Sequence, residues 1–132
     1  GSGLITNSAC SHVAGYPVCF KESKSMSYAS LMIVTTTFDD RQKALEVSRL
    51  LVDAGLAVCS QVGERMDSFY RWEGEVVQAE EFRVTFKVLG DRFDLFCGEL
   101  KLVHPFDVPQ LVAWPAGHTD KNYLNWAKGK SK

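Results

Sequence analysis

The sequence predicts one α+β domain with the element order β-α-β-β-α-β, a long β-hairpin and a C-terminal helix. Three observations lead to this prediction. Apolar and polar residues alternate over residues 81–88, which is the period of a half-buried strand. Two segments, within residues 39–55 and 90–105, carry apolar residues at helical spacing. Glu73 and Gly74 separate two strand-like segments, and a glycine there tolerates the positive φ of a two-residue turn.

The first strand and helix are expected between residues 31 and 55. Residues 31–34 and the three threonines after them are typical of a buried strand. We predict that Asp39 caps the next helix, with Gln42 completing a capping box three residues later. Gly55 then provides the left-handed residue that ends the helix.

The hairpin is longer than one small domain can cover. A second strand over residues 56–62 is expected to bulge at Gly63 and Glu64 before the arm begins. Residues 75–89 contain neither Pro nor Gly, and at roughly 3.4 Å per residue they would span about 50 Å. A domain of this size is only about 33 Å across. We therefore expect the overhanging arm to pack on another copy of the chain.

The second half of the chain repeats the pattern. Residues 90–91 open a second helix, and Pro105 ends it. Residues 108–114 are expected to form the fourth strand, with Pro109 at an edge or at the strand start. A short helix over residues 120–128 closes the chain. This order is the ferredoxin-like split βαβ arrangement, in which right-handed crossovers place both helices on one sheet face.

The remaining segments complete the predicted domain organisation, and the composition disfavours a nucleic-acid-binding or membrane-spanning protein. Residues 1–30 lack sustained periodicity, and we interpret them as a flexible extension in which Tyr16, Val18 and Phe20 could add an edge strand. Residues 31–128 form the domain, and residues 129–132 a basic tail. A net charge of −1 disfavours nucleic-acid binding. No apolar run approaches the roughly 20 residues of a membrane span, and no signal peptide is evident, so a cytoplasmic protein is expected.

Four short motifs resemble those of the CutA divalent-cation tolerance family. They occur in the family's order and spacing, from about residue 31 to residue 128. The motifs are Leu56-Ala57-Val58-Cys59, Ser68-Phe69-Tyr70-Arg71-Trp72-Glu73-Gly74, His104-Pro105-Phe106-Asp107-Val108-Pro109 and Tyr123-Leu124-Asn125-Trp126. The resemblance implies a compact homotrimer, joined through sheet edges and hairpin arms. It also implies a non-enzymatic role in tolerance of copper and other divalent cations.

The resemblance also implies a metal site, which this sequence matches only at His104. The family member best known for copper binding has a Cys and a Glu where this chain has Thr35 and Gln110. One imidazole does not make a site for copper or another divalent cation, which usually needs two or three such ligands. His104 is therefore either a metal ligand completed by other groups or a hydrogen-bonding residue at a helix end.

Aromatic side chains and one lysine define a second candidate site. Tyr70, Trp72, Lys87 and Trp126 could line a cleft between subunits that takes a small ligand. The aromatic residues could equally be packing anchors of an interface. The family's trimer resembles that of the PII signalling proteins, which makes a small-ligand sensor the alternative function. The tight Glu73-Gly74 turn disfavours it, because phosphate binding needs a Gly-rich loop.

An enzyme is the third hypothesis. The chain has no G-x-S-x-G, H-E-x-x-H or P-loop motif, and we assign no catalytic residue. Cys59 and Cys97 are interpreted as small core residues in a reducing compartment. Cys59 and His104 could in principle pair as nucleophile and base.

Overall fold

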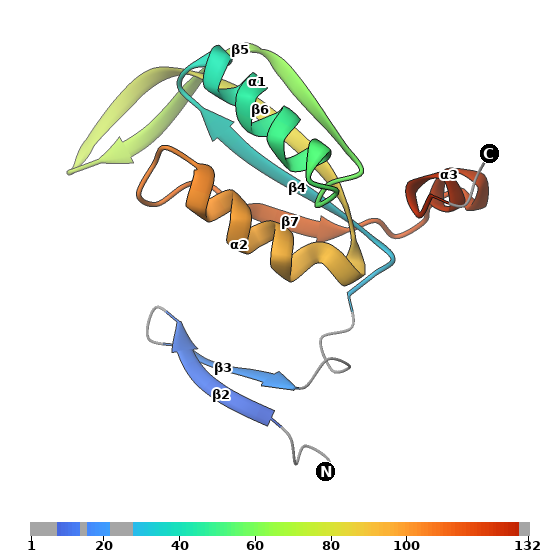
Figure 1. Ribbon diagram of the computed structural model, residues 1–132. Coiled ribbons are helices and arrows are strands. Elements are labelled where there is room, and N and C mark those ends of the chain that lie inside the picture. The colour runs from blue at the N-terminus through green and yellow to red at the C-terminus, as the bar shows by residue number, and fades with distance from the viewer. Residues whose placement is uncertain (1–7, 14–15, 22–27, 130–132) are drawn as a thin grey trace.

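The computed structural model describes residues 8–13, 16–21 and 28–129 (Figure 1). Its main sheet has four strands in the order β5-β6-β4-β7, and each neighbouring pair is antiparallel. The strands are β4 (Leu31–Phe38), β5 (Cys59–Trp72), β6 (Glu75–Leu89) and β7 (Val112–Pro115). The helices that accompany this sheet are α1 (Arg41–Asp53), α2 (Phe93–Val103) and α3 (Lys121–Ala127), with a 3-10 turn, η1 (Gly90–Arg92), leading into α2. This element order and this strand order confirm the predicted ferredoxin-like arrangement.

An N-terminal hairpin forms a separate two-stranded sheet. Strands β2 (Ser8–Val13) and β3 (Tyr16–Lys21) pair only with each other. The strand considered for Tyr16, Val18 and Phe20 is therefore present, but it does not extend the edge of the main sheet. That residues 1–30 are a flexible extension stays a prediction, and residues 1–7, 14–15, 22–27 and 130–132 lie outside the described part.

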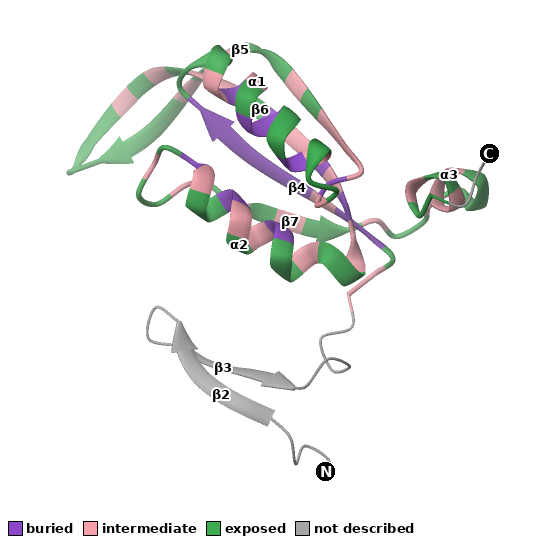
Figure 2. Ribbon diagram, viewed as in Figure 1, coloured by how far each residue is buried: buried purple, intermediate pink, exposed green. Residues whose placement is uncertain are grey.

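Helices α1 and α2 lie on one face of the sheet, as Figure 1 shows, and the core fills the space between them and the strands. Alternation along β6 sends Val84, Phe86 and Val88 into this core with no exposed surface. The ring of Phe86 meets that of Phe96 on α2 edge to face, with centroids 4.9 Å apart. The purple segments of β4, α1 and α2 in Figure 2 mark the same buried layer.

The long hairpin leaves the body after a bulge. The register of β5 against β6 shifts between Val62 and Arg65, as predicted for Gly63 and Glu64. At the tip, Glu73 and Gly74 have φ angles of 49° and 82°, as a type I′ turn requires. Figure 2 shows the arm as mostly exposed ribbon that projects from the domain. The described residues of its own chain therefore leave the arm largely uncovered.

Three sequence-based boundaries were wrong. The N-cap of α1 is Asp40, whose extended backbone lets its carboxylate accept a hydrogen bond from the Lys43 N–H at 3.2 Å; Asp39 lies one residue too early. Strand β5 begins at Cys59 rather than residue 56, because the N–H groups of residues 56 and 57 still bond to the Leu51 carbonyl of α1. Strand β7 is shorter than residues 108–114, since Pro109 has no N–H to donate to a ladder.

The correction at the helix cap gives a direct test. Replacing Asp40 by Ala should lower the free energy of unfolding by about 1 kcal/mol, because the Lys43 N–H loses its acceptor. The matched change Asp39→Ala should cost clearly less, since no side-chain cap depends on that carboxylate. Urea denaturation of both variants measures the difference. Equal losses would show that the cap is assigned to the wrong residue.

Candidate functional site

The sheet face opposite α1 and α2 carries polar side chains from β5 and β6, with α3 beside one end. Cys59 on β5 lies directly across from Lys87 on β6. The Lys87 ammonium donates to the Gln61 side-chain oxygen at 3.0 Å and lies 3.9 Å from the Cys59 sulfur. The hydroxyl of Tyr123 on α3 is also 3.9 Å from that sulfur. We call these four residues the Cys59 cluster.

This position corrects the interpretation of Cys59 as a core residue. Its cross-strand partner Lys87 points away from the core, because its neighbours Phe86 and Val88 point into it. Cys59 is therefore half-buried on the open face. Cys97 on α2 does pack against the core, and burial raises the pKa of its thiol to about 11.

Trp126 extends the Cys59 cluster toward a shallow hollow. Its ring lies 5.5 Å from that of Tyr123, centroid to centroid. The hollow has a volume of about 370 Å³ and lies between α3 and the segment that joins α1 to β5, with Leu56 and Arg92 in its wall. Burial and the contact with Cys59 raise the pKa of the Tyr123 hydroxyl. Lys87 and Trp126 are thus connected through Cys59 and Tyr123.

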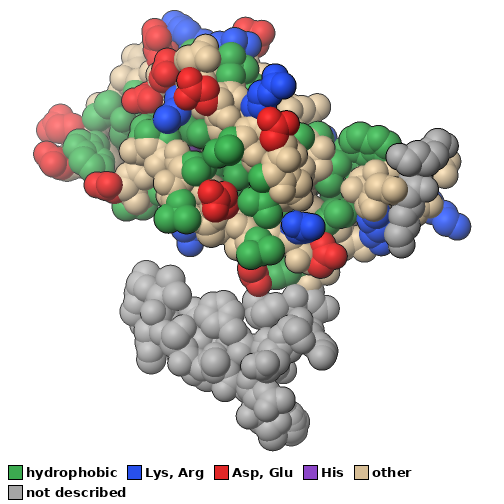
Figure 3. All heavy atoms as spheres, in the orientation of Figure 1, with side chains coloured by type: hydrophobic (Ala, Val, Ile, Leu, Met, Phe, Trp, Pro, Cys, Tyr) green, Lys and Arg blue, Asp and Glu red, His purple; other side chains and the backbone are tan. Residues whose placement is uncertain are grey.

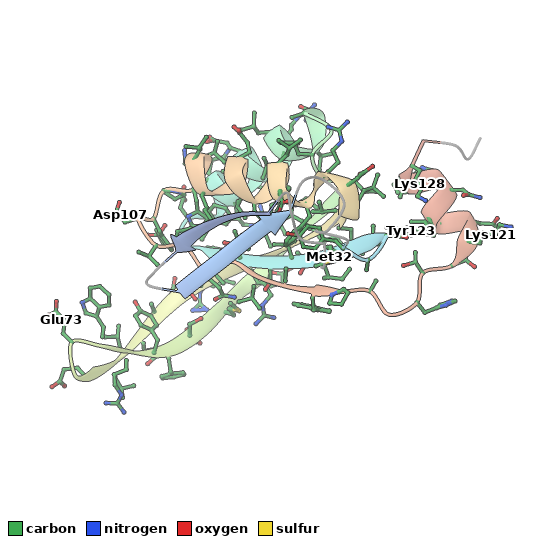
Figure 4. All side chains as sticks on the ribbon, turned by 90° about the horizontal axis from the view of Figure 1, so that it is seen from below. Met32, Glu73, Asp107, Lys121, Tyr123 and Lys128 are labelled. Atoms are coloured by element: carbon green, nitrogen blue, oxygen red, sulfur yellow. The ribbon has the colours of Figure 1, made fainter. Side chains whose placement is uncertain are left out.

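Tyr70 and Trp72 lie at the other end of the hairpin. They pair with Val77 and Glu75 beside the turn. Val77 and Lys87 are ten residues apart on β6, which is about 34 Å at roughly 3.4 Å per residue. Figure 4 shows Glu73 at the arm tip and Tyr123 at the opposite end of the domain. One chain therefore does not bring the four predicted cleft residues together, and a cleft between subunits stays a prediction.

His104 closes the core at the end of α2. It is 6% exposed, and its ring stacks on Phe38 with centroids 4.3 Å apart. Its Nε2 lies 2.9 Å from the Thr37 carbonyl oxygen, and its Nδ1 lies 3.2 Å from the Phe106 N–H. A carbonyl only accepts and an N–H only donates, so Nε2 carries the proton and Nδ1 is the acceptor. Burial lowers the pKa of the imidazole below 6.5, which agrees with this neutral form.

These hydrogen bonds do not fit a metal site at His104. A metal needs a free lone pair on the imidazole, and here one nitrogen bears the proton while the other accepts from Phe106. Within the described ranges, no three His, Cys, Asp or Glu side chains lie close enough together to hold an ion. Within one chain the ring makes the hydrogen bonds of the structural role considered above, at the helix end before Pro105. A metal site completed by another subunit stays a prediction.

Cys59 and His104 do not form a nucleophile and base. Cys59 and Lys87 lie in register with Ile33 at one end of β4, whereas His104 bonds to Thr37. Four residues of strand separate the two points, or about 13 Å.

The sequence-based prediction missed the contact between Cys59 and Tyr123. The two residues are 64 positions apart in the chain, and no local pattern connects them.

Comparison with known proteins identifies the family. The model of the family described as CutA1 divalent ion tolerance protein matches residues 32–130. The chain belongs to this family. The Divalent-cation tolerance protein CutA of Thermus thermophilus is 31% identical over 96 residues, covering 73% of this chain and 93% of the relative. That of Thermotoga maritima is 31% identical over 98 residues, covering 74% and 96%.

A solved structure agrees with the sequence relatives. The CutA1 of Shewanella sp. SIB1 superposes with a TM-score of 0.74 at 28% identity, covering 80% of this chain and 98% of that protein. The CutA1 match covers residues 32–130, which include all four motifs. It therefore confirms the family that these motifs suggested. Across the described ranges, no helix of this CutA1 protein has the length and apolarity to cross a bilayer.

The buried His104 makes stability depend on pH. Because its folded-state pKa lies below 6.5, the unfolded chain binds the proton more readily, and stability falls as pH drops through 6.5 toward the folded value. The free energy of unfolding should therefore drop more between about pH 7.5 and about pH 5.5 in the parent than in His104→Gln.

Denaturant titrations at both pH values measure this difference. His118→Gln is the matched control, because His118 is exposed and should leave the parent's pH dependence intact. An undiminished loss in His104→Gln would assign the pH dependence to other groups.

Proposed function

We propose that this CutA1 protein acts as a homotrimer that serves divalent-cation tolerance without catalysing a reaction. The observation that carries the proposal is the uncovered arm. Phe69, Trp72 and Val76 near its tip are 66%, 62% and 64% exposed. Apolar side chains gathered on a projecting ribbon favour burial against another chain. The open sheet face, bordered by α3, offers a second surface for a neighbouring copy.

The cation role rests on the relatives rather than on a metal centre in this chain. The proteins of Thermus thermophilus and Thermotoga maritima are named divalent-cation tolerance proteins. We carry this role to the present chain, place it in the cytoplasm, and take copper as the cation to test first. The proposal of a non-enzymatic role rests on the sequence, which has no G-x-S-x-G, H-E-x-x-H or P-loop motif. The two-residue turn at Gly74 gives the PII-like sensor alternative no phosphate-binding loop.

Assembly through the arm predicts a specific loss of mass. Light scattering should give three times the chain mass for the parent at micromolar concentration. The double change Phe69→Ser and Trp72→Ser should give a smaller species, because it removes exposed apolar surface from the arm. Leu95→Ser with Leu102→Ser is the matched control, since these α2 residues are 62% and 80% exposed but lie off the arm. A monomeric parent would refute the assembly.

The cation role predicts a growth phenotype. Expression of the parent in a bacterium whose own CutA relative has been deleted should restore growth on inhibitory copper, and the arm variant should restore it less. An equally sensitive strain with and without the parent would refute the role. If the arm variant restored growth as well as the parent, tolerance would not depend on assembly through the arm.

Calorimetric titration of Cu²⁺ tests the assignment of His104. We expect the parent and His104→Gln to give the same heat, because both ring nitrogens are already hydrogen-bonded within the chain. His118→Gln controls for adventitious binding by an exposed imidazole. Heat lost only in His104→Gln would establish His104 as a ligand and reverse the conclusion drawn from its hydrogen bonds.

A further inference from the structure

The N-terminal hairpin places two cysteines directly opposite each other. In the register of β2 against β3, Cys10 pairs with Cys19, two positions from the pair of His12 with Pro17. The hairpin lies before residues 32–130, over which the CutA1 family model matches. Neither the homotrimer nor the cation role proposed above involves it. The cysteine pair is therefore an addition to the family domain.

Pro17 determines which kind of pair the two cysteines form. An antiparallel ladder alternates between pairs that exchange both of their N–H···O bonds and pairs that exchange none. Pro17 has no N–H to donate, so its pair with His12 is of the second kind. A step of two positions along both strands returns to the same kind of pair. Cys10 and Cys19 therefore form a non-hydrogen-bonded pair as well.

This kind of pair suits a disulfide. In a non-hydrogen-bonded pair the two Cα atoms lie about 4.5 Å apart, and directly opposed residues belong to the same face of the ribbon. Disulfides join residues whose Cα atoms are about 4.4–6.8 Å apart. The register of the hairpin thus allows a bond between Cys10 and Cys19 without any change in strand pairing.

The hairpin is also a structure that a cross-link would stabilise. Its two strands pair with each other, and among the described strands none extends their sheet. An isolated two-stranded hairpin is only marginally stable in water. A disulfide stabilises mainly by restricting the open chain, so its effect is largest where few other contacts hold the strands together. A bond across the hairpin would therefore hold β2 and β3 in register.

We propose that Cys10 and Cys19 form a reversible dithiol–disulfide site that is oxidised by small disulfides such as glutathione disulfide. The thiolate of one cysteine attacks the small disulfide, and a mixed disulfide forms as the first small thiolate leaves. The other cysteine then attacks the protein sulfur of that mixed disulfide, and the Cys10–Cys19 bond forms as the second small thiolate leaves.

The exchange balances without any further reagent. Two protein thiols lose two electrons and two protons, and one small disulfide gains them to become two thiols. An excess of small thiol runs the same steps backward. Such reversibility is what a disulfide in a reducing compartment requires, and it agrees with the cytoplasmic location proposed above.

The test measures the redox equilibrium of the two cysteines in the full-length protein. The protein is equilibrated near neutral pH with mixtures of reduced and oxidised glutathione, and the remaining thiols are alkylated. Trypsin leaves residues 1–21 as one peptide, because Lys21 is the first Lys or Arg of the chain. The internal disulfide is then read in a mass spectrometer as this peptide without alkyl groups.

The equilibrium constant for the internal disulfide should be at least about tenfold larger in the folded protein than in the same chain in denaturing urea, because the hairpin holds the cysteines opposite each other. Equal constants in the two conditions would overturn the proposal. So would a folded protein in which residues 1–21 carry glutathione, or a bond to a second chain, in place of the internal disulfide.

A register variant separates strand pairing from closeness in sequence. The double change Cys10→Ser and Ser11→Cys moves the cysteine one position along β2, to the other face and opposite Val18. The loop to Cys19 becomes one residue shorter, so a chain without fixed register would close it at least as readily. The equilibrium constant should fall at least about tenfold below that of the parent. A constant equal to the parent's would show that closeness in sequence alone drives the bond, against the proposal.

These outcomes are independent of the proposed function. The unfolding midpoint of the reduced domain should be the same in the parent and the register variant, because the hairpin does not pair with the main sheet. The redox equilibrium can be measured whether or not the chain forms a trimer or supports growth on copper. Conversely, cysteines that form no internal bond would leave the mass and the growth phenotype untouched.

Discussion

Strand β6 is the element on which the rest of the structure depends, because it pairs along its whole length but with different partners. Residues 82–87 lie between β4 and β5, residues 88–89 pair with β4 alone, and residues 75–81 pair with β5 alone. In the shared half, Val84 and Phe86 anchor the core under both helices. In the other half, none of the helices in the described part of the chain covers the ribbon, and it projects as the exposed arm seen in Figure 2.

The same alternation that builds the core also creates the open face. Each apolar residue that β6 sends toward α1 and α2 obliges its neighbour to point the other way. Lys87 is such a neighbour, and its position across from Cys59 is a consequence of strand register rather than of any local motif. Figure 3 shows green apolar side chains among charged ones on the surface seen in the view of Figure 1. The alternation along β6 therefore determines both which side chains form the core and which lie on the open face.

The residues that mark the chain as a CutA1 protein have identifiable structural tasks. Gly74 makes the tight turn possible, and His104 satisfies the Thr37 carbonyl at the edge of the core. Tyr123 reaches the start of β5 from α3, beyond the last strand. The family signature is thus to a large extent a signature of the fold. A metal role for His104 would have to break two hydrogen bonds that the fold already uses, which is an energetic cost that an exposed imidazole would not carry.

The amino-acid sequence by itself determined the element order, the hairpin turn and the apolar faces, because each depends on neighbours within a few residues. The alternation around Phe86 and the positive φ at Gly74 are local properties of this kind. Only the tertiary structure decided which tautomer His104 adopts and that Cys59 lies against Lys87 and Tyr123. Those contacts join residues 28 to 67 positions apart. No period in the sequence encodes such a distance, since it is set by how strands register and helices dock.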